Sequence, residues 1–211
     1  YESVFGDWSS DVCSSDLGDE DESEDGGAVA QRPARRGTVS ELVAQESRCI
    51  LIGEPGGGKS TCLRFWTLDD LEAYGEGARL SLFVPLARFA GDLEALIVAE
   101  CGFPAPLLRR LAESGRLRLL LDALNECPDR FQETCVAQIR ARLAQYPALS
   151  VVLTTRSHHY RRQVSLPVFV VQPLAAARQA AFLAGYLDDP GQAETLLGKL
   201  TASDADRKSV V

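Results

Sequence analysis

Residues 53–60 have the sequence Gly53-Glu54-Pro55-Gly56-Gly57-Gly58-Lys59-Ser60. This octapeptide matches the pattern G-x-x-x-x-G-K-[ST] of a phosphate-binding loop. It follows an apolar run at 49–52 that is typical of a buried strand, and it leads into residues 61–66, which are typical of the start of a helix. Because a strand, a loop and a helix in this order are the context that the pattern requires, we expect the chain to bind a nucleoside triphosphate.

The residue types in this loop suit the chemistry of phosphate. Glycines let consecutive backbone N–H groups converge on phosphate oxygens, and the start of a helix adds a partial positive charge at the same place. Lys59 brings an ammonium for the β- and γ-phosphates, and the Ser60 hydroxyl is placed to ligate Mg²⁺. The predicted nucleotide-binding residues are Gly53, Glu54, Pro55, Gly56, Gly57, Gly58, Lys59, Ser60 and Thr61.

The composition of the 211 residues excludes several classes of protein. The net charge is −8, but residues 1–25 hold ten acidic and no basic residues, which leaves 22 Lys and Arg against 20 Asp and Glu, or +2, for the rest. Such a balance gives no broad basic field for nucleic acid. No apolar run is long enough to span a membrane and no signal peptide is recognisable, so we expect a cytoplasmic location. The cysteines lack paired spacing and are expected to be free thiols; they lie at positions 13, 49, 62, 101, 127 and 135.

The two ends of the chain differ in character from its middle. Residues 7–17 and 206–211 resemble translated sequencing-adapter read-through, and the chain begins at Tyr1 with no methionine, so we expect a fragment. Residues 1–17 are therefore predicted to be artefactual or disordered, and residues 18–46 to be an acidic linker with a short lead-in helix. The nucleotide-binding domain is predicted over 47–190, followed at 191–211 by the start of a helical segment and an artefactual tail.

Apolar runs alternate with helical patterns through the middle of the chain. The runs predict strands at 49–52, 80–85, 117–121, 150–155 and 168–171. Helices are predicted from the phosphate loop to about residue 74 and near 93–100, 106–113, 130–145 and 175–186. Strands that are apolar on both faces and alternate with helices predict an α/β fold of three layers, with a five-stranded parallel sheet between helices.

A second motif follows the strand at 117–121. Its sequence, LLLDALNE at 119–126, ends an apolar strand in Asp122, which is how phosphate-loop proteins place a carboxylate near Mg²⁺, usually through a bound water. Many such ATPases carry a water-activating Glu directly after this Asp, where the present chain has Ala123. The candidate for that catalytic role is therefore Glu126, one helical turn further on.

A third motif, VVLTTR at 151–156, places polar residues where open α/β sheets bind their ligands. Arg156 is the candidate for a contact with the γ-phosphate; the alternative is a surface arginine that merely follows a strand. His158 and His159 are adjacent in a basic loop and lack the spacing of a metal site, so we expect this loop beside the nucleotide or at a domain interface. Trp66 is expected in the core, and Cys127 is expected to be inert.

The three motifs, in this order and at this spacing, resemble the NACHT family of STAND NTPases. That class consists of nucleotide-gated signalling switches in animal innate immunity and in bacterial defence and regulation. The resemblance covers about residues 45–190 and rests on the segments 53–61, 119–126 and 153–156, with softer matches at 82–90, Pro173, Leu174, Phe182, Leu183, Tyr186 and Leu187. It implies a sheet in which the strand before the phosphate loop is separated from the strand of Asp122 (the Walker B strand) by the strand of Arg156.

The resemblance also implies a function, with one departure. It implies ATP or ADP with Mg²⁺, with GTP left open, and self-association in the ATP-bound form under the control of sensor and effector domains outside this sequence. Many members carry two acids at the end of the second motif, whereas Asn125 replaces the first here, so hydrolysis is expected to rest on Glu126 or to be slow. Two alternatives are a nucleotide-binding scaffold with little hydrolysis and a cycling AAA+-like ATPase, against which Ala123 argues.

Overall fold

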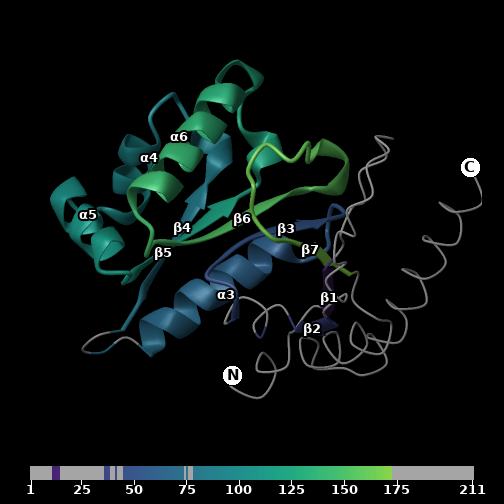
Figure 1. Ribbon diagram of the computed structural model, residues 1–211, viewed down its shortest axis with the longest axis horizontal. Coiled ribbons are helices and arrows are strands. Elements are labelled where there is room, and N and C mark those ends of the chain that lie inside the picture. Colours follow the sequence, from purple (N-terminus) through teal and green to yellow (C-terminus); the bar gives the residue numbers. More distant parts are fainter. Residues whose placement is uncertain are drawn as a thin grey trace, which may run out of the picture. The chain divides into compact units, whose positions relative to one another are not determined.

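The computed structural model describes residues 11–14, 36–38, 41, 45–73, 75 and 78–172 (Figure 1). Several predicted segments lie outside these residues: most of the acidic linker and its lead-in helix, the helix at 175–186, and the segment at 191–211. The phosphate loop and all three motifs lie inside them.

Five parallel strands form the sheet that carries the motifs. They are β3 (Arg48–Gly53), β4 (Leu80–Pro85), β5 (Leu117–Asp122), β6 (Ser150–Arg156) and β7 (Val168–Val171). Their order is β7-β3-β6-β5-β4, and each neighbouring pair is parallel. The strand β6 therefore lies between the phosphate-loop strand β3 and the Walker B strand β5, which confirms the predicted fold and strand order.

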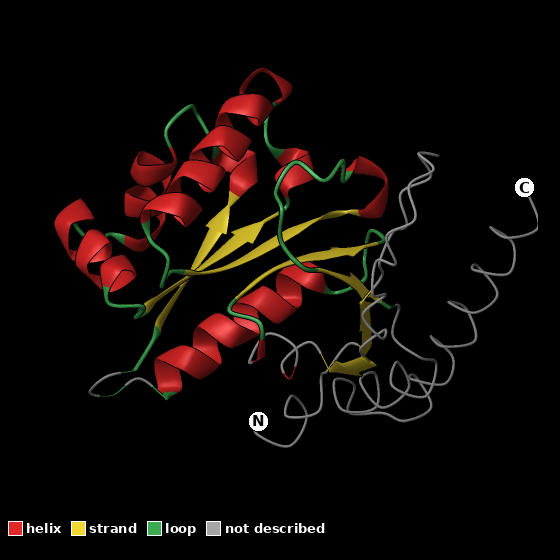
Figure 2. Cartoon of the chain, in the orientation of Figure 1, coloured by secondary structure: helices red, strands yellow, loops and turns green. Residues whose placement is uncertain are grey.

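Helices cover both faces of this sheet (Figures 1 and 2). They are α3 (Lys59–Glu72) on one face and α4 (Leu93–Cys101), α5 (Ala105–Glu113) and α6 (Gln132–Gln145) on the other. Because side chains alternate along a strand, β3 contributes to two separate cores. Its residues Ile50 and Ile52 pack on the α4–α6 side, and Cys49 and Leu51 pack on the α3 side, where Trp66 is buried as expected.

Two further short strands extend the sheet beyond β7. They are β1 (Asp11–Ser14) and β2 (Arg36–Thr38), and both β1–β7 and β1–β2 are antiparallel. These residues fall in segments that composition assigned to a disordered end and a linker. Backbone pairing explains the difference, because β7 would otherwise leave a row of unpaired N–H and C=O groups, which β1 pairs with, and β2 pairs with β1 in the same way. Such pairing requires no hydrophobic pattern.

The structure also shows the state of five cysteines and tests for helices that could cross a membrane. Cys49, Cys62, Cys101, Cys127 and Cys135 are free thiols. Burial raises the pKa of Cys127, which suits the expectation that this thiol is inert. Among the residues that the structure describes, no helix is both long and apolar enough to cross a membrane.

The parallel arrangement brings three strand ends together at one edge of the sheet. Gly53 at the end of β3 pairs in register with Arg156 at the end of β6, and Leu121 of β5 pairs with Leu153 of β6. The carboxyl ends of parallel strands are the edge at which open α/β sheets bind ligands. The phosphate loop, Asp122 and Arg156 consequently share this edge.

Candidate nucleotide-binding site

The phosphate loop connects the end of β3 to the start of α3. Gly56 and Gly58 have φ angles of 77° and 80°, in the left-handed region that a residue with a Cβ rarely adopts. Gly58 is also the N-cap of α3, and no side chain caps this helix end. Its first backbone N–H groups therefore lack a side-chain acceptor, which is the arrangement that binds phosphate at a helix N-terminus.

Lys59 lies folded back against its own loop. Its Nζ donates hydrogen bonds to the carbonyl oxygens of Gly53, at 2.7 Å, and Glu54, at 2.8 Å. Burial lowers the pKa of Lys59 from its ordinary value, and the charges of Asp122 and Glu54 oppose that shift while Arg156 adds to it. The ammonium is thus within the electrostatic reach of the other predicted site residues.

Ser60 and Asp122, the two residues expected to hold Mg²⁺, contact each other. The Ser60 hydroxyl donates to Asp122 Oδ1 at 3.0 Å, although the two residues lie 62 positions apart. Asp122 is only 7% exposed. A hydroxyl and a carboxylate are hard oxygen ligands of the kind that Mg²⁺ prefers, so this residue pair fits the ion that the family implies.

Thr154 is a member of this site that the sequence analysis did not assign. Its Oγ1 lies 2.6 Å from Asp122 Oδ1 and accepts a hydrogen bond of 2.8 Å from the backbone N–H of Ala123. The available signal was positional, since Asp122 and Thr154 follow residues that pair in register, Leu121 and Leu153. Motif matching alone did not reveal it, because the two residues belong to different motifs.

Glu126 and Arg156, which were predicted to act separately, contact each other. Ala123 takes φ 57° and ψ 61°, and this left-handed turn leads into the short helix η2 (Leu124–Glu126). Glu126 Oε1 lies 3.4 Å from Arg156 Nη2, and the two side chains are 50% and 42% exposed. Asn125 Oδ1 accepts a hydrogen bond of 3.1 Å from the backbone N–H of Arg156. The second and third motifs are therefore linked through both side chain and backbone.

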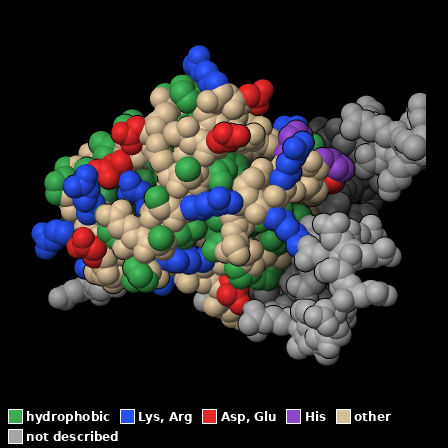
Figure 3. Space-filling view, turned by 45° about the horizontal axis from the view of Figure 1, so that its top comes forward, with side chains coloured by type: hydrophobic (Ala, Val, Ile, Leu, Met, Phe, Trp, Pro, Cys, Tyr) green, Lys and Arg blue, Asp and Glu red, His purple; other side chains and the backbone are tan. Residues whose placement is uncertain are grey.

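The histidine loop lies beside the phosphate loop. His158, in the short helix η4 (Ser157–His159), places Nε2 3.4 Å from Oε1 of Glu54. Both side chains are exposed, and Figure 3 shows the histidines on the surface near Lys and Arg side chains. Within the described parts of the chain, no group of three or more His, Cys, Asp or Glu side chains could hold a metal ion.

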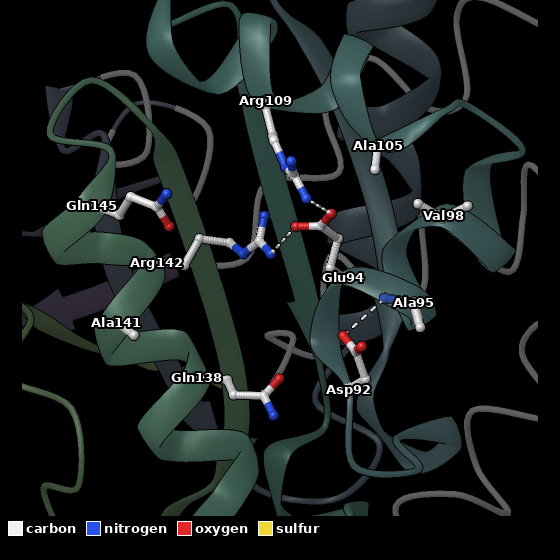
Figure 4. Close-up of a pocket in the computed structure, with 10 residues that line it drawn as sticks. All are labelled: Asp92, Glu94, Ala95, Val98, Ala105, Arg109, Gln138, Ala141, Arg142 and Gln145. Atoms are coloured by element: carbon white, nitrogen blue, oxygen red, sulfur yellow. Dashed lines mark hydrogen bonds and ion pairs between the residues drawn. The ribbon is translucent and has the colours of Figure 1, made fainter.

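A separate groove of about 570 Å³ lies between α4, α5 and α6 (Figure 4). Its centre is Glu94, which pairs with Arg109 at 2.5 Å and with Arg142 at 3.1 Å. The hydrogen bond from Arg109 is the main cause that lowers the pKa of Glu94. The groove contains no residue of the phosphate loop and its central charges are already paired, so we assign it no part in nucleotide binding. Its lining residues are Asp92, Glu94, Ala95, Val98, Ala105, Arg109, Gln138, Ala141, Arg142 and Gln145.

Solved structures with a similar fold share little sequence with this chain. A DNA replication initiation factor has a TM-score of 0.50 and 13% identity, over 81% of this chain and 58% of its own. A Walker-type ATPase of Pyrococcus abyssi has 0.46 and 15%, over 76% and 60%. A STAND protein (signal transduction ATPase with numerous domains) with a tetratricopeptide repeat sensor, from Pyrococcus horikoshii, has 0.41 and 13%, over 76% and 27%. We take the fold alone from the first of these likenesses.

The three structures named above are longer than this chain, which spans between 27% and 60% of their length. The sequence comparisons are more specific than these likenesses of fold. A search of curated protein sequences gives no match. The family model described as the NACHT domain matches residues 47–190, which include the phosphate loop and the ends of β5 and β6. Because this match covers well over half of the 211 residues, the chain belongs to the NACHT domain family.

Proposed function

We propose that this chain is the ATP-binding module of a signalling switch, in which slow Mg²⁺-dependent hydrolysis of ATP controls self-association. The observation that carries the proposal is the meeting of Lys59, Ser60 and Asp122 at one edge of the sheet, within a NACHT domain. ATP is the nucleotide that the family implies, and effector and sensor domains would lie outside this sequence.

The phosphate loop and α3 would hold the triphosphate. Backbone N–H groups of the loop and of the first turn of α3 would bind phosphate oxygens, and Lys59 would exchange its two carbonyl acceptors for the β- and γ-phosphates. Ser60 would ligate Mg²⁺ directly, and Asp122 would hold it through water. When bound, the ion neutralises negative charge on the phosphates.

Arg156 would report which nucleotide is bound. Its guanidinium is 42% exposed and its contact with Glu126 is long, so a γ-phosphate can draw it away from that carboxylate at small cost. Only contacts that differ between ATP and ADP can shift the equilibrium between two conformations. Arg156 and Lys59 are the positive side chains placed to make such contacts, and they would favour the form that self-associates.

The same geometry supports slow turnover. Glu126 would act as the base that activates water, but its carboxylate is paired with Arg156. Asn125, which replaces an acid found in many family members, is occupied by the backbone N–H of Arg156. These two contacts also favour the second candidate function, a nucleotide-binding scaffold with little hydrolysis. Ala123 argues against a cycling AAA+-like ATPase, because no carboxylate follows Asp122 directly.

Measurements of steady-state and single-turnover ATP hydrolysis test the proposal and distinguish the candidate functions. The switch predicts roughly one turnover per minute or slower, with Glu126→Gln trapping ATP and sedimentation showing larger assemblies with ATP than with ADP. Turnover that Glu126→Gln leaves unchanged would favour the scaffold. Turnover at tens per second by the wild-type chain would exclude the switch and favour a cycling ATPase.

A further inference from the structure

The hydroxyl of Thr154 has a direction that the contacts around it determine. Thr154 is 1% exposed, and its Oγ1 lies between the Ala123 backbone N–H, at 2.8 Å, and Asp122 Oδ1, at 2.6 Å. An amide N–H can only donate, so the Thr154 oxygen accepts on that side. Its single proton is therefore donated to Asp122. The hydroxyl thus bridges the backbone of the turn at Ala123 and the carboxylate of Asp122 by two hydrogen bonds of fixed direction.

This bridge determines how Asp122 presents its two oxygens. Among the described residues, Ser60 and Thr154 both donate to Oδ1, at 3.0 Å and 2.6 Å. A carboxylate oxygen has two lone pairs, so Oδ1 is fully used by these two hydroxyls. Oδ2 is then the oxygen available to a water or an ion, and the side chain cannot rotate without losing both hydrogen bonds.

The other end of the bridge holds an unfavourable backbone conformation. Ala123 has φ 57°, in the left-handed region that a Cβ disfavours. Two hydrogen bonds retain it there: its N–H donates to Thr154, and its carbonyl oxygen accepts from the N–H of Glu126 at 2.8 Å. The turn in turn places Asn125 against Arg156. A change at Thr154 therefore acts on both Asp122 and the segment that carries Glu126.

We propose that Thr154 is a positioning residue of the magnesium site, whose hydroxyl couples the orientation of Asp122 to the turn that carries Asn125 and Glu126. This inference rests on the proposed binding of nucleotide with Mg²⁺. It assigns Thr154 no contact with nucleotide. Its effect should therefore be visible in how strongly Mg²⁺ enhances ATP binding, rather than in ATP binding without the ion.

The neighbouring Thr155 provides a matched control. It is 2% exposed, nearly as buried as Thr154, and it lies in the same strand. Because successive side chains of a strand point to opposite faces, Thr155 faces away from Asp122. Thr155→Val thus removes a buried hydroxyl of the same kind without breaking the bridge.

The inference is tested by measuring the ATP affinity of the full chain by titration, once with Mg²⁺ and once with EDTA. The variants compared with the wild type are Thr154→Val, Thr154→Ser and Thr155→Val. We expect Thr154→Val to reduce the Mg²⁺ enhancement of affinity about tenfold with affinity in EDTA unchanged, because it removes one hydrogen bond to a charged group. Thr154→Ser, which keeps the hydroxyl, should restore most of the enhancement, and Thr155→Val should resemble the wild type.

The outcomes separate this inference from the proposed function. A wild-type chain that shows no Mg²⁺-enhanced ATP binding would overturn both. A normal enhancement in a folded Thr154→Val variant would overturn the positioning role alone, as would an equal loss in Thr155→Val. If the valine variant does not fold, Thr154→Ala compared with Thr154→Ser gives the same test, and equal enhancement in these two would reject the inference.

Discussion

Two groups of residues at the same edge of the sheet differ in how closely their side chains contact each other and in how deeply they are buried. Ser60, Asp122 and Thr154, here called the magnesium corner, are joined by hydrogen bonds of 2.6 and 3.0 Å to a carboxylate that is 7% exposed. Glu126 and Arg156, the outer pair, meet at 3.4 Å with side chains that are 50% and 42% exposed. Buried hydrogen bonds are costly to break, whereas exposed ion pairs contribute about 0–1 kcal/mol.

The difference indicates that the two groups have different roles within the site. The magnesium corner is organised by the fold itself, since β3–α3, β5 and β6 each provide one of its residues. The outer pair can change partners at little cost, as a residue that distinguishes ATP from ADP must. The proposed switch requires both properties, a fixed place for the ion and a movable contact for the γ-phosphate.

Substitution in the magnesium corner should have the largest effect. Asp122→Asn keeps the shape of the side chain but removes the charge that would hold Mg²⁺ through water. We expect Mg²⁺-dependent affinity for ATP to fall about thirtyfold or more, because interactions with a charged group contribute roughly 1.5–3 kcal/mol. Calorimetric titration measures this, and Asp92→Asn, in the separate groove, is the control; equal losses in both variants would contradict the assignment.

Substitution in the outer pair should affect nucleotide discrimination more than binding. Arg156→Ala is expected to lower ATP affinity about tenfold and to leave ADP affinity within about twofold, since a contact with the γ-phosphate is absent from ADP. Competition of both nucleotides for a fluorescent analogue would measure the ratio. Equal weakening for ATP and ADP would mean that Arg156 supports the loop rather than the γ-phosphate.

The turn between the two groups should be strained in a measurable way. Ala123→Gly removes the Cβ from a residue with φ 57°. We expect the unfolding free energy to rise by about 0.5–1 kcal/mol, because glycine adopts this region without the steric penalty. Urea denaturation provides the measurement. A loss of stability would show that the greater freedom of glycine in the unfolded chain outweighs the relief of strain.

The smallest expected effect concerns the stability of the outer pair. Glu126→Gln removes the ion pair with Arg156 but leaves the backbone of η2 intact. Because both side chains are about half exposed, the unfolding free energy should change by less than about 0.5 kcal/mol. A loss above about 1.5 kcal/mol in urea denaturation would mean that the pair is part of the folded framework, and the contrast with the magnesium corner would not hold.

Much of the fold could be predicted from the sequence because its strands carry strong local signals. The predicted ranges 80–85 and 168–171 agree with β4 and β7, and the other three strands differ by one or two residues at their ends. Apolar runs bounded by Gly, Asp or Arg determine these ends locally. The strands β1 and β2 could not be predicted, since β1 depends on backbone pairing with the distant strand β7 and β2 depends on pairing with β1.

The candidate site, like the fold, could be predicted from the sequence only in part. The phosphate loop, Asp122 and Arg156 were identified by motif, and the structure brings them to one edge. The contacts of Thr154 with Ala123 and of Asn125 with Arg156 each join residues 31 positions apart. They depend on the register of β5 against β6, which no local pattern specifies. The Thr154 hydroxyl and the Asn125 amide oxygen become part of the site because the paired strands bring them to their partners.

Calorimetric titration of the wild-type chain and of Lys59→Ala with ATP and Mg²⁺ tests the central claim most directly. Arg64→Ala, on the same helix but stacked over Phe83 instead of facing the loop, is the matched control. We predict Mg²⁺-dependent ATP binding in the wild type and in the control, and a loss of about thirtyfold or more in Lys59→Ala. Unaltered affinity in Lys59→Ala, or a wild-type chain that binds no ATP, would contradict the assignment of a nucleotide-binding site.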